Sequence, residues 1–154
     1  MIKIDVIVED KGWNLFIKNP SIYIKKKTNK LKKIKLFNSS NLECTLLLSD
    51  SNRIKYLNKN FRNKNKNTDV LSFPSFEKKK LNKEISNKKK IYIGDIIINI
   101  DKVSNNNKNT EVFLKNFNKL WIHGLIHLFG YKHKKNSDFD EMKKIEEKIF
   151  KLIN

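Results

Sequence analysis

Cysteine and proline are scarce in this chain of 154 residues, which contains one cysteine and two prolines. The single cysteine, Cys44, cannot form an internal disulfide, and it lies in the apolar run LECTLLL. A cysteine in such a run is typically a small buried hydrophobic residue of a protein from a reducing compartment. These features argue against a disulfide-stabilised protein and against catalysis by a thiol.

Long hydrophobic runs are also missing. The N-terminal stretch MIKIDVIVEDKGW interrupts its apolar residues with charges, and no run of 18 apolar residues follows it. A membrane-spanning helix needs about 20 consecutive apolar residues, and a secretory signal needs an uninterrupted apolar core. We therefore expect a cytoplasmic protein with no membrane partner. Its length and its hydrophobic content of 38% suit one domain, residues 1–154, with a real core.

Acidic residues are few: the chain has 16 of them against 34 lysines and arginines, and its net charge is +18. Lysines that neutralise phosphates release counterions, so this excess favours a nucleic-acid partner. However, only Arg53 and Arg62 are arginines, and asparagine is abundant. An AT-rich coding sequence would produce the same bias, so charge alone leaves nucleic-acid binding open.

Four stretches have the pattern of β-strands. MIKIDVIV at the N-terminus alternates apolar and polar residues, and LECTLLLSD, TDVLSF and IYIGDIIINI are short and rich in β-branched or apolar residues. Pro74 should stop the third of these strands, because proline cannot donate a backbone hydrogen bond.

Helical patterns alternate with these strands. They cover residues 13–37 with a break near Pro20, a segment capped by Asp50 or Ser51, residues 110–129, and a last helix opened by Ser137 with Asp140. Residues 76–90 carry many charges and little apolar content, so we expect a solvated loop there. The fold class is then α+β, with a mixed sheet of about four strands packed against about four helices.

All three histidines of the chain lie in one short stretch, WIHGLIHLFGYKHK, residues 121–134. On a helix with about 100° per residue, His123 and His127 are one turn apart and point together away from the core-facing stripe. That stripe consists of Leu114, Phe117, Trp121, Leu125 and Leu128. Gly130 is placed to end the helix in a left-handed conformation, which would return the chain so that His133 joins the pair.

Three imidazoles with room for a water are typical of a catalytic zinc site, since a structural zinc usually has a fourth protein ligand. The sequence therefore predicts a metal site at His123, His127 and His133, on a central helix and the turn after it. Zinc is favoured, although nickel, copper or iron would bind the same ligands. The alternative is that three unrelated surface histidines happen to share a turn.

The same histidine spacing occurs in metzincin proteases, HExxHxxGxxH, in which the glutamate after the first histidine is the general base. Here that position is Gly124. A protease that lacks its base would be badly impaired, so proteolysis is the second choice.

The segment HGLIHLFGYKH resembles the HGxLHLxGYDH signature of the YbeY family of bacterial endoribonucleases, which mature ribosomal RNA. Two further blocks are similar to that family: LNKNFRNKNKNTDVLSF, residues 57–73, and IGDIIIN, residues 93–99. The three blocks run from Leu57 to Met142 in the family's order. One departure is Lys132, where the family usually has an aspartate beside the third histidine, and this could weaken the orientation of His133.

The resemblance implies an α+β fold, one zinc-type ion held by the three histidines, and cleavage of single-stranded RNA. It also implies a role in 16S rRNA 3′-end maturation and ribosome quality control, with the ribosome or its small subunit as partner and no DNA substrate. The family's functional arginine corresponds to Arg62, whose planar guanidinium suits bidentate contact with phosphate.

A mechanism follows as a hypothesis, in which the metal ion activates a water and polarises the phosphate while Arg62 offsets the developing charge. His123 and Arg62 are then catalytic residues. Tyr131, Asp95 or a second water could protonate the leaving group, and the sequence does not choose between them. Asp95 could instead accept a histidine N–H, and Asp69 could simply cap a turn. A further alternative is a ribosome assembly factor without catalysis, in which the metal is structural.

Overall fold

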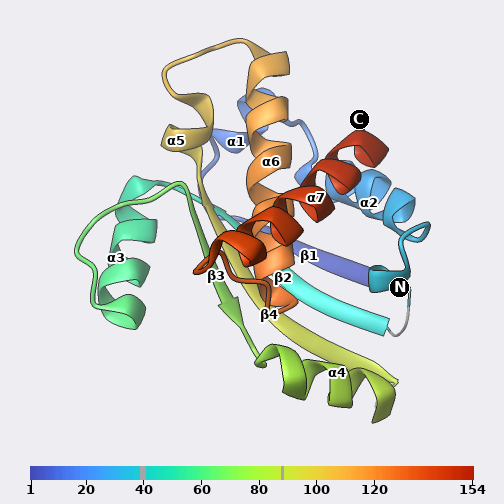
Figure 1. Ribbon diagram of the computed structural model, residues 1–154. Helices are drawn as coiled ribbons and strands as arrows, with labels where there is room; N and C mark the ends of the chain where they lie inside the picture. Colours follow the sequence, from blue (N-terminus) through green and yellow to red (C-terminus); the bar gives the residue numbers. More distant parts are fainter. Residues whose placement is uncertain (39–40, 88) are drawn as a thin grey trace.

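A four-stranded mixed sheet forms the centre of the protein, for which the computed structural model describes residues 1–38, 41–87 and 89–154. The strand order is β1-β2-β4-β3, and Figure 1 shows the strands crossing the middle of the molecule. β1 pairs with β2 and β2 with β4 in parallel, whereas β3 runs antiparallel to β4 at the edge. This arrangement confirms the α+β class. The strands are β1 (Ile2–Val8), β2 (Asn41–Ser49), β3 (Val70–Pro74) and β4 (Lys90–Asn99).

The second half of β4, residues 96–99, is buried on both sides because helices pack against both faces of the sheet. Ile96 and Ile98 belong to the main core, whereas Ile97 joins a smaller cluster with Leu71 and Ile54 on the other face. Alternate residues of a strand point to opposite faces, which is why the continuous run IIIN can serve both layers.

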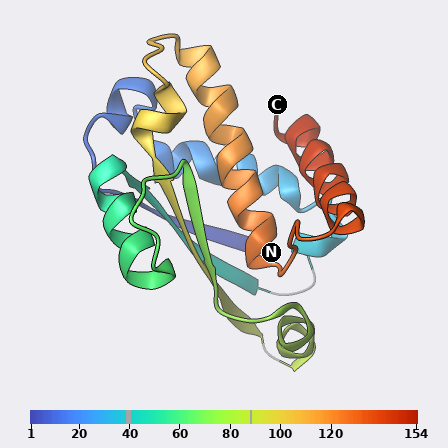
Figure 2. The ribbon, with the colours of Figure 1, turned by 60° about the vertical axis from the view of Figure 1, so that its left-hand side comes forward.

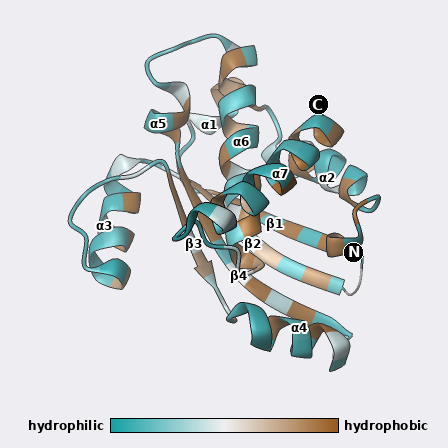
Figure 3. Cartoon of the chain, viewed as in Figure 1, coloured by the Kyte–Doolittle hydropathy of each residue, from teal (hydrophilic) through white to brown (hydrophobic). Residues whose placement is uncertain are grey.

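Three long helices cover one face of the sheet and a fourth helix covers part of the other. α2 packs against β1, α6 against β3 and β4, and α7 against α2 and α6. In Figure 2 the strands lie between α3 on one side and α6 with α7 on the other. Figure 3 shows hydrophilic residues on most of the outer helix surface and hydrophobic residues along the strands. These helices are α2 (Pro20–Leu31), α3 (Ser51–Arg62), α6 (Thr110–Leu128) and α7 (Asn136–Ile153).

α6 is the helix that carries two of the histidines, and it forms almost as the sequence predicted. Asn109 caps its start by accepting hydrogen bonds from the amides of Glu111 and Val112. Its core-facing stripe is buried except for the half-buried Leu114. Gly130, at φ +83°, follows the helix and donates its amide to the carbonyl of His127, so the predicted left-handed glycine is confirmed.

Several local predictions were wrong. Residues 76–90 are not a loop, because α4 (Lys78–Asn87) forms there and buries Leu81; residue 88 lies outside the described residues. The buried Leu81 and the half-buried Ile85, one turn apart, dock this short lysine-rich helix against the core, and two apolar residues are a weak pattern in a sequence. α7 begins at Asn136 after Lys135, with no side-chain cap, so the cap predicted from Ser137 and Asp140 is wrong.

The predicted number of helices was too small, because short helices give little periodic signal. The described part of the chain has seven α-helices and one 3-10 helix. The predicted break near Pro20 is confirmed, since Asn19 caps α2 and Pro20 is its first residue. The short elements are α1 (Trp13–Phe16), η1 (Lys35–Phe37) and α5 (Ile100–Ser104).

Candidate metal centre and active site

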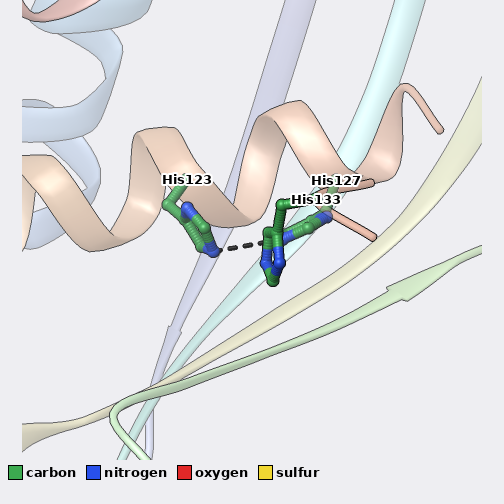
Figure 4. Close-up of side chains that lie close together, drawn as sticks. All are labelled: His123, His127 and His133. Atoms are coloured by element: carbon green, nitrogen blue, oxygen red, sulfur yellow. Dashed lines mark hydrogen bonds between the residues drawn. The ribbon is translucent and has the colours of Figure 1, made fainter. Parts of the chain in front are cut away.

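The three histidines converge at the C-terminal end of α6. His123 and His127 lie on the last two turns of the helix, and His133 approaches from the chain that returns toward α7. Each ring offers one nitrogen, and these three nitrogens all lie within 4.8 Å of one another. Figure 4 shows the three side chains grouped on one side of the helix. The convergence predicted from the spacing of the histidines is therefore observed.

The ring orientations fit a shared metal ion. The Nε2 atoms of His123 and His127 lie 3.0 Å apart, as the dashed line in Figure 4 marks. The opposite nitrogens are occupied by protein partners, because Nδ1 of His127 is 2.7 Å from the Tyr131 carbonyl oxygen and Nδ1 of His123 is 2.7 Å from Oε1 of Glu146. Each Nδ1–H donates to an oxygen, so each Nε2 lone pair is left for a ligand.

Glu146 is a site residue that the sequence did not reveal. It lies in the middle of α7, twenty-three residues beyond His123, and its side chain is half-buried against the imidazole. An acidic residue on an amphipathic helix ordinarily faces solvent. Only the packing of α7 against α6 brings this carboxylate to the histidine.

The environment also favours a neutral His127. Burial lowers the pKa of this imidazole; the hydrogen bond to the Tyr131 carbonyl opposes the lowering, and the neighbouring His123 and His133 add to it. A histidine must be deprotonated on one nitrogen to bind a metal ion. The lowered pKa therefore prepares His127 as a ligand.

Arg62 shares one cavity of about 710 Å³ with the three histidines. It is the last residue of α3, and its guanidinium donates to the Ser72 carbonyl oxygen at 2.6 Å while lying 5.4 Å from the centre of the Phe73 ring. These contacts with β3 fix the direction of the side chain, and within the part of the chain that the structure describes its guanidinium has no other hydrogen-bond partner.

Tyr131 and Asp69 also line this cavity. Burial raises the pKa of the Tyr131 phenol, with a further contribution from Glu141, and Lys78 Nζ lies 4.0 Å from the ring centre. Asp69 accepts hydrogen bonds from the Val70 amide and the Thr68 hydroxyl just before β3, which is consistent with the turn-capping role predicted for it.

Asp95 is placed elsewhere. It accepts a hydrogen bond from the Tyr92 hydroxyl and lines a different cavity, of about 500 Å³, together with Thr45 and Phe73. That cavity lies on the sheet face of α3, where Leu57 also contributes. The two histidine Nδ1 atoms that might have met Asp95 are paired with Glu146 and Tyr131 instead.

Gly124 shows why a protease base has no place here. A Cβ atom at this position would lie 2.6 Å from Cγ2 of Ile96 and 3.1 Å from Oγ of Ser72. The Ser72 hydroxyl also donates to the Gly124 carbonyl at 3.2 Å. Position 124 thus faces the sheet at close contact, with no room for a glutamate side chain.

Fold and site together define an α+β domain with a candidate three-histidine metal centre and an arginine in the same cavity. The family model described as Endoribonuclease YbeY matches residues 15–154, which is nearly the whole chain. The chain belongs to this family, as its motifs suggested.

Relatives and a solved structure agree with this assignment. The Endoribonuclease YbeY of Pelagibacter ubique is 43% identical over 155 residues, covering 99% of this chain and 97% of that protein. The Bartonella henselae protein of the same name is 32% identical and covers 100% of this chain and 94% of its own length. The solution structure of TM1509 from Thermotoga maritima is similar with a TM-score of 0.62 and 26% identity, covering 98% of this chain and 89% of that one.

The helices were compared with the length and hydropathy that a membrane span requires. Within the described ranges, none is both long enough and apolar enough to cross a bilayer.

Proposed function

We propose that this protein is a metal-dependent endoribonuclease that hydrolyses phosphodiester bonds of single-stranded RNA. His123, His127 and His133 bind the metal ion, and Arg62 binds the phosphate that is cleaved. The observation that carries the proposal is the shared cavity, in which Arg62 from α3 faces the same space as three histidines from α6 and the following turn. Membership of an endoribonuclease family supplies the substrate class.

Three imidazoles fit zinc, and other transition metals would accept the same donors. A metal ion held in this way would act as a Lewis acid and could activate water for attack on a phosphodiester at neutral pH. The protein's part is to orient the ligands: Glu146 and the Tyr131 carbonyl fix which nitrogen of His123 and His127 carries the proton.

Arg62 supplies positive charge and directed donors at the phosphate. One of its N–H groups is held by the Ser72 carbonyl, so the fork is oriented before the substrate arrives. Such preorganised donors stabilise the charge that develops as the phosphate is attacked. Tyr131, which lines the same cavity, is a candidate proton donor for the leaving oxygen, and a second water is the other.

Lysines on the cavity wall extend the contact with RNA. Lys78, Lys132 and Lys134 line the cavity with Arg62 and provide charge for neighbouring phosphates. Lys132 stands where the family usually has an aspartate, and this exchange adds positive charge next to His133. A lysine at this position attracts the polyanionic RNA. Unlike an aspartate, it does not help to orient the imidazole of His133.

In the cell, we place this activity in 16S rRNA 3′-end maturation and ribosome quality control, with the small ribosomal subunit as partner and the cytoplasm as location. These roles rest on the resemblance to the family. Lysines that bind the phosphates of the RNA backbone do not distinguish one base from another. The ribosome would then determine which bond is cleaved.

The test is an RNA cleavage assay with end-labelled single-stranded RNA and purified, untagged protein. Cleavage should stop after chelation, return with added zinc or another transition metal, and fall strongly in Arg62→Lys, whose side chain keeps the charge but loses the fork. Arg53→Lys is the matched control, because Arg53 pairs with Glu9 away from the histidines. Equal cleavage by both variants would contradict the role of Arg62.

A ribosome assembly factor with a structural metal is the second candidate. The observation in its favour is that the His123–Glu146 contact joins α6 to α7, so a metal ion at the histidines would also stabilise the helix packing. In that case metal removal would lower the melting temperature sharply, and Arg62→Ala would leave cellular function intact. The enzyme predicts the opposite pattern.

A further inference from the structure

A second hollow adjoins the histidine cavity. It has a volume of about 430 Å³ and lies between the start of β3, one side of α6 and one side of α7. Three residues, His123, Asp69 and Val70, line both hollows, so the two spaces meet at the candidate metal centre. We call this second hollow the α6–α7 groove.

The floor of the α6–α7 groove is apolar although it opens to solvent. Ile122 is buried, and Leu120, Val70 and Phe150 are half-buried around it. An aromatic ring and aliphatic side chains in a hollow of this size are typical of a site for a flat or small organic group.

The rim of the groove is basic. Lys119 on α6 and Lys143 and Lys151 on α7 line it, and all three are exposed. The groove also contains two carboxylates besides Asp69. Glu146 is bound to His123, and Glu147 is exposed and offers acceptors that suit the amino group of a base.

We propose that the α6–α7 groove binds the base of a nucleotide next to the scissile phosphate, while its rim lysines contact the flanking phosphates. The inference rests on the proposed function. An RNA strand whose phosphate lies at the histidines must continue on both sides of them, and the α6–α7 groove meets the cavity of Arg62 at His123. The groove is the adjoining hollow that combines apolar surface for a base with cations for its phosphates.

The first experiment measures binding of a single-stranded 2′-O-methyl RNA oligonucleotide by fluorescence anisotropy. The groove variant carries Lys119→Gln, Lys143→Gln and Lys151→Gln. Its affinity should fall about tenfold or more. The slope of log Kd against log salt should shrink by about 2, since each lost phosphate contact on a single strand removes about 0.7.

The matched control removes the same charge from the same two helices. Lys115 on α6 and Lys144 and Lys148 on α7 are exposed residues outside the lining of the groove. Their triple replacement by glutamine should cost less than threefold in affinity, because only the long-range attraction changes. Equal losses in the groove variant and the control variant would overturn the proposal.

The second experiment tests the base itself and needs no change in the protein. One abasic nucleotide is placed at successive positions of a cleavable RNA, and the products are mapped. Cleavage should fall about tenfold at a phosphodiester on one fixed side of the abasic position, since the strand loses the stacking of one base on an aromatic side chain. In Leu120→Trp, where an indole ring replaces the smaller leucine side chain and fills the groove, that position-dependent loss should disappear.

The outcomes separate the two proposals. If the wild-type protein cleaves RNA while abasic positions have no effect and the groove variant matches the control, only the groove assignment fails, and an apolar protein segment becomes the better occupant. If the wild-type protein neither binds nor cleaves single-stranded RNA, the proposed function fails and the groove assignment fails with it.

Discussion

Nδ1 of His123 lies 2.7 Å from Oε1 of Glu146, which joins the end of α6 that carries the candidate metal ligands to the middle of α7. The contact fixes the tautomer of His123, because the Nδ1–H donates to the carboxylate and Nε2 is left for the ligand. It also gives α7 a role in the site that its sequence pattern does not suggest.

Replacing Glu146 by glutamine should weaken metal binding more than it changes the fold. An amide keeps the size of the side chain but loses the charge that makes His123 a better ligand, and outer partners of this kind typically contribute about 10–100-fold in metal affinity. Competition with a chromophoric chelator measures the change. Glu147→Gln is the neighbouring control, and an equal effect of both substitutions would contradict the orienting role of Glu146.

Arg62→Lys should lower kcat about 100-fold or more with little change in melting temperature, since loss of one preorganised donor typically costs that much. The lysine keeps the positive charge but cannot bind the Ser72 carbonyl and a phosphate with one rigid fork. Arg53→Lys should change kcat less than twofold. Steady-state kinetics on RNA and a thermal melt of each variant test whether Arg62 acts in catalysis or in stability. A melting temperature that falls together with kcat would indicate that Arg62 is a structural residue.

Gly124→Ala should destabilise the protein by about 1–3 kcal/mol, which is the usual cost of overpacking. The added methyl would lie 2.6 Å from Cγ2 of Ile96, and this clash outweighs the better helix propensity of alanine, about 1 kcal/mol. Urea unfolding of Gly124→Ala, Ile96→Ala and the double variant forms a cycle. The penalty of the alanine should shrink once Ile96 is truncated, and additive effects would argue against this contact.

Cys44 should resist thiol reagents in the folded protein. Its side chain is fully buried in the core, and burial raises the pKa of the thiol, with Asp95 and Asp5 adding to the rise. A raised pKa keeps the thiol protonated at neutral pH, and the thiolate is the reactive form. Labelling should therefore be slow in buffer and rapid in denaturant. Fast labelling of native protein would mean that β2 opens readily.

The strands and the long helices could be predicted because their patterns are strong and local. β4 and α6 are the clearest examples, since one is a continuous apolar run and the other has a wide apolar stripe. α4 was missed because Leu81 is its one fully buried residue. The start of α7 was misplaced because the chain enters that helix at Lys135 without a side-chain cap.

The part of the site that could be predicted consists of residues that lie close together in the sequence. The histidines are four and ten residues apart, and the geometry of a helix followed by a glycine turn brings them together. Glu146 could not be found in this way, because its place depends on how α7 crosses α6. The same limit explains Asp95: a carboxylate on β4 can face either side of the sheet, and it points to the face of α3.

The most direct test of the central claim measures metal content by mass spectrometry on untagged protein, for the wild type and His123→Ala, together with cleavage of single-stranded RNA by the same samples. We predict about one transition metal ion per wild-type chain, as one site with three ligands requires, and loss of both metal and cleavage in the variant. Wild-type protein that is folded and cleaves RNA without stoichiometric metal would contradict the mechanism, and the three histidines would then be residues that merely share a turn.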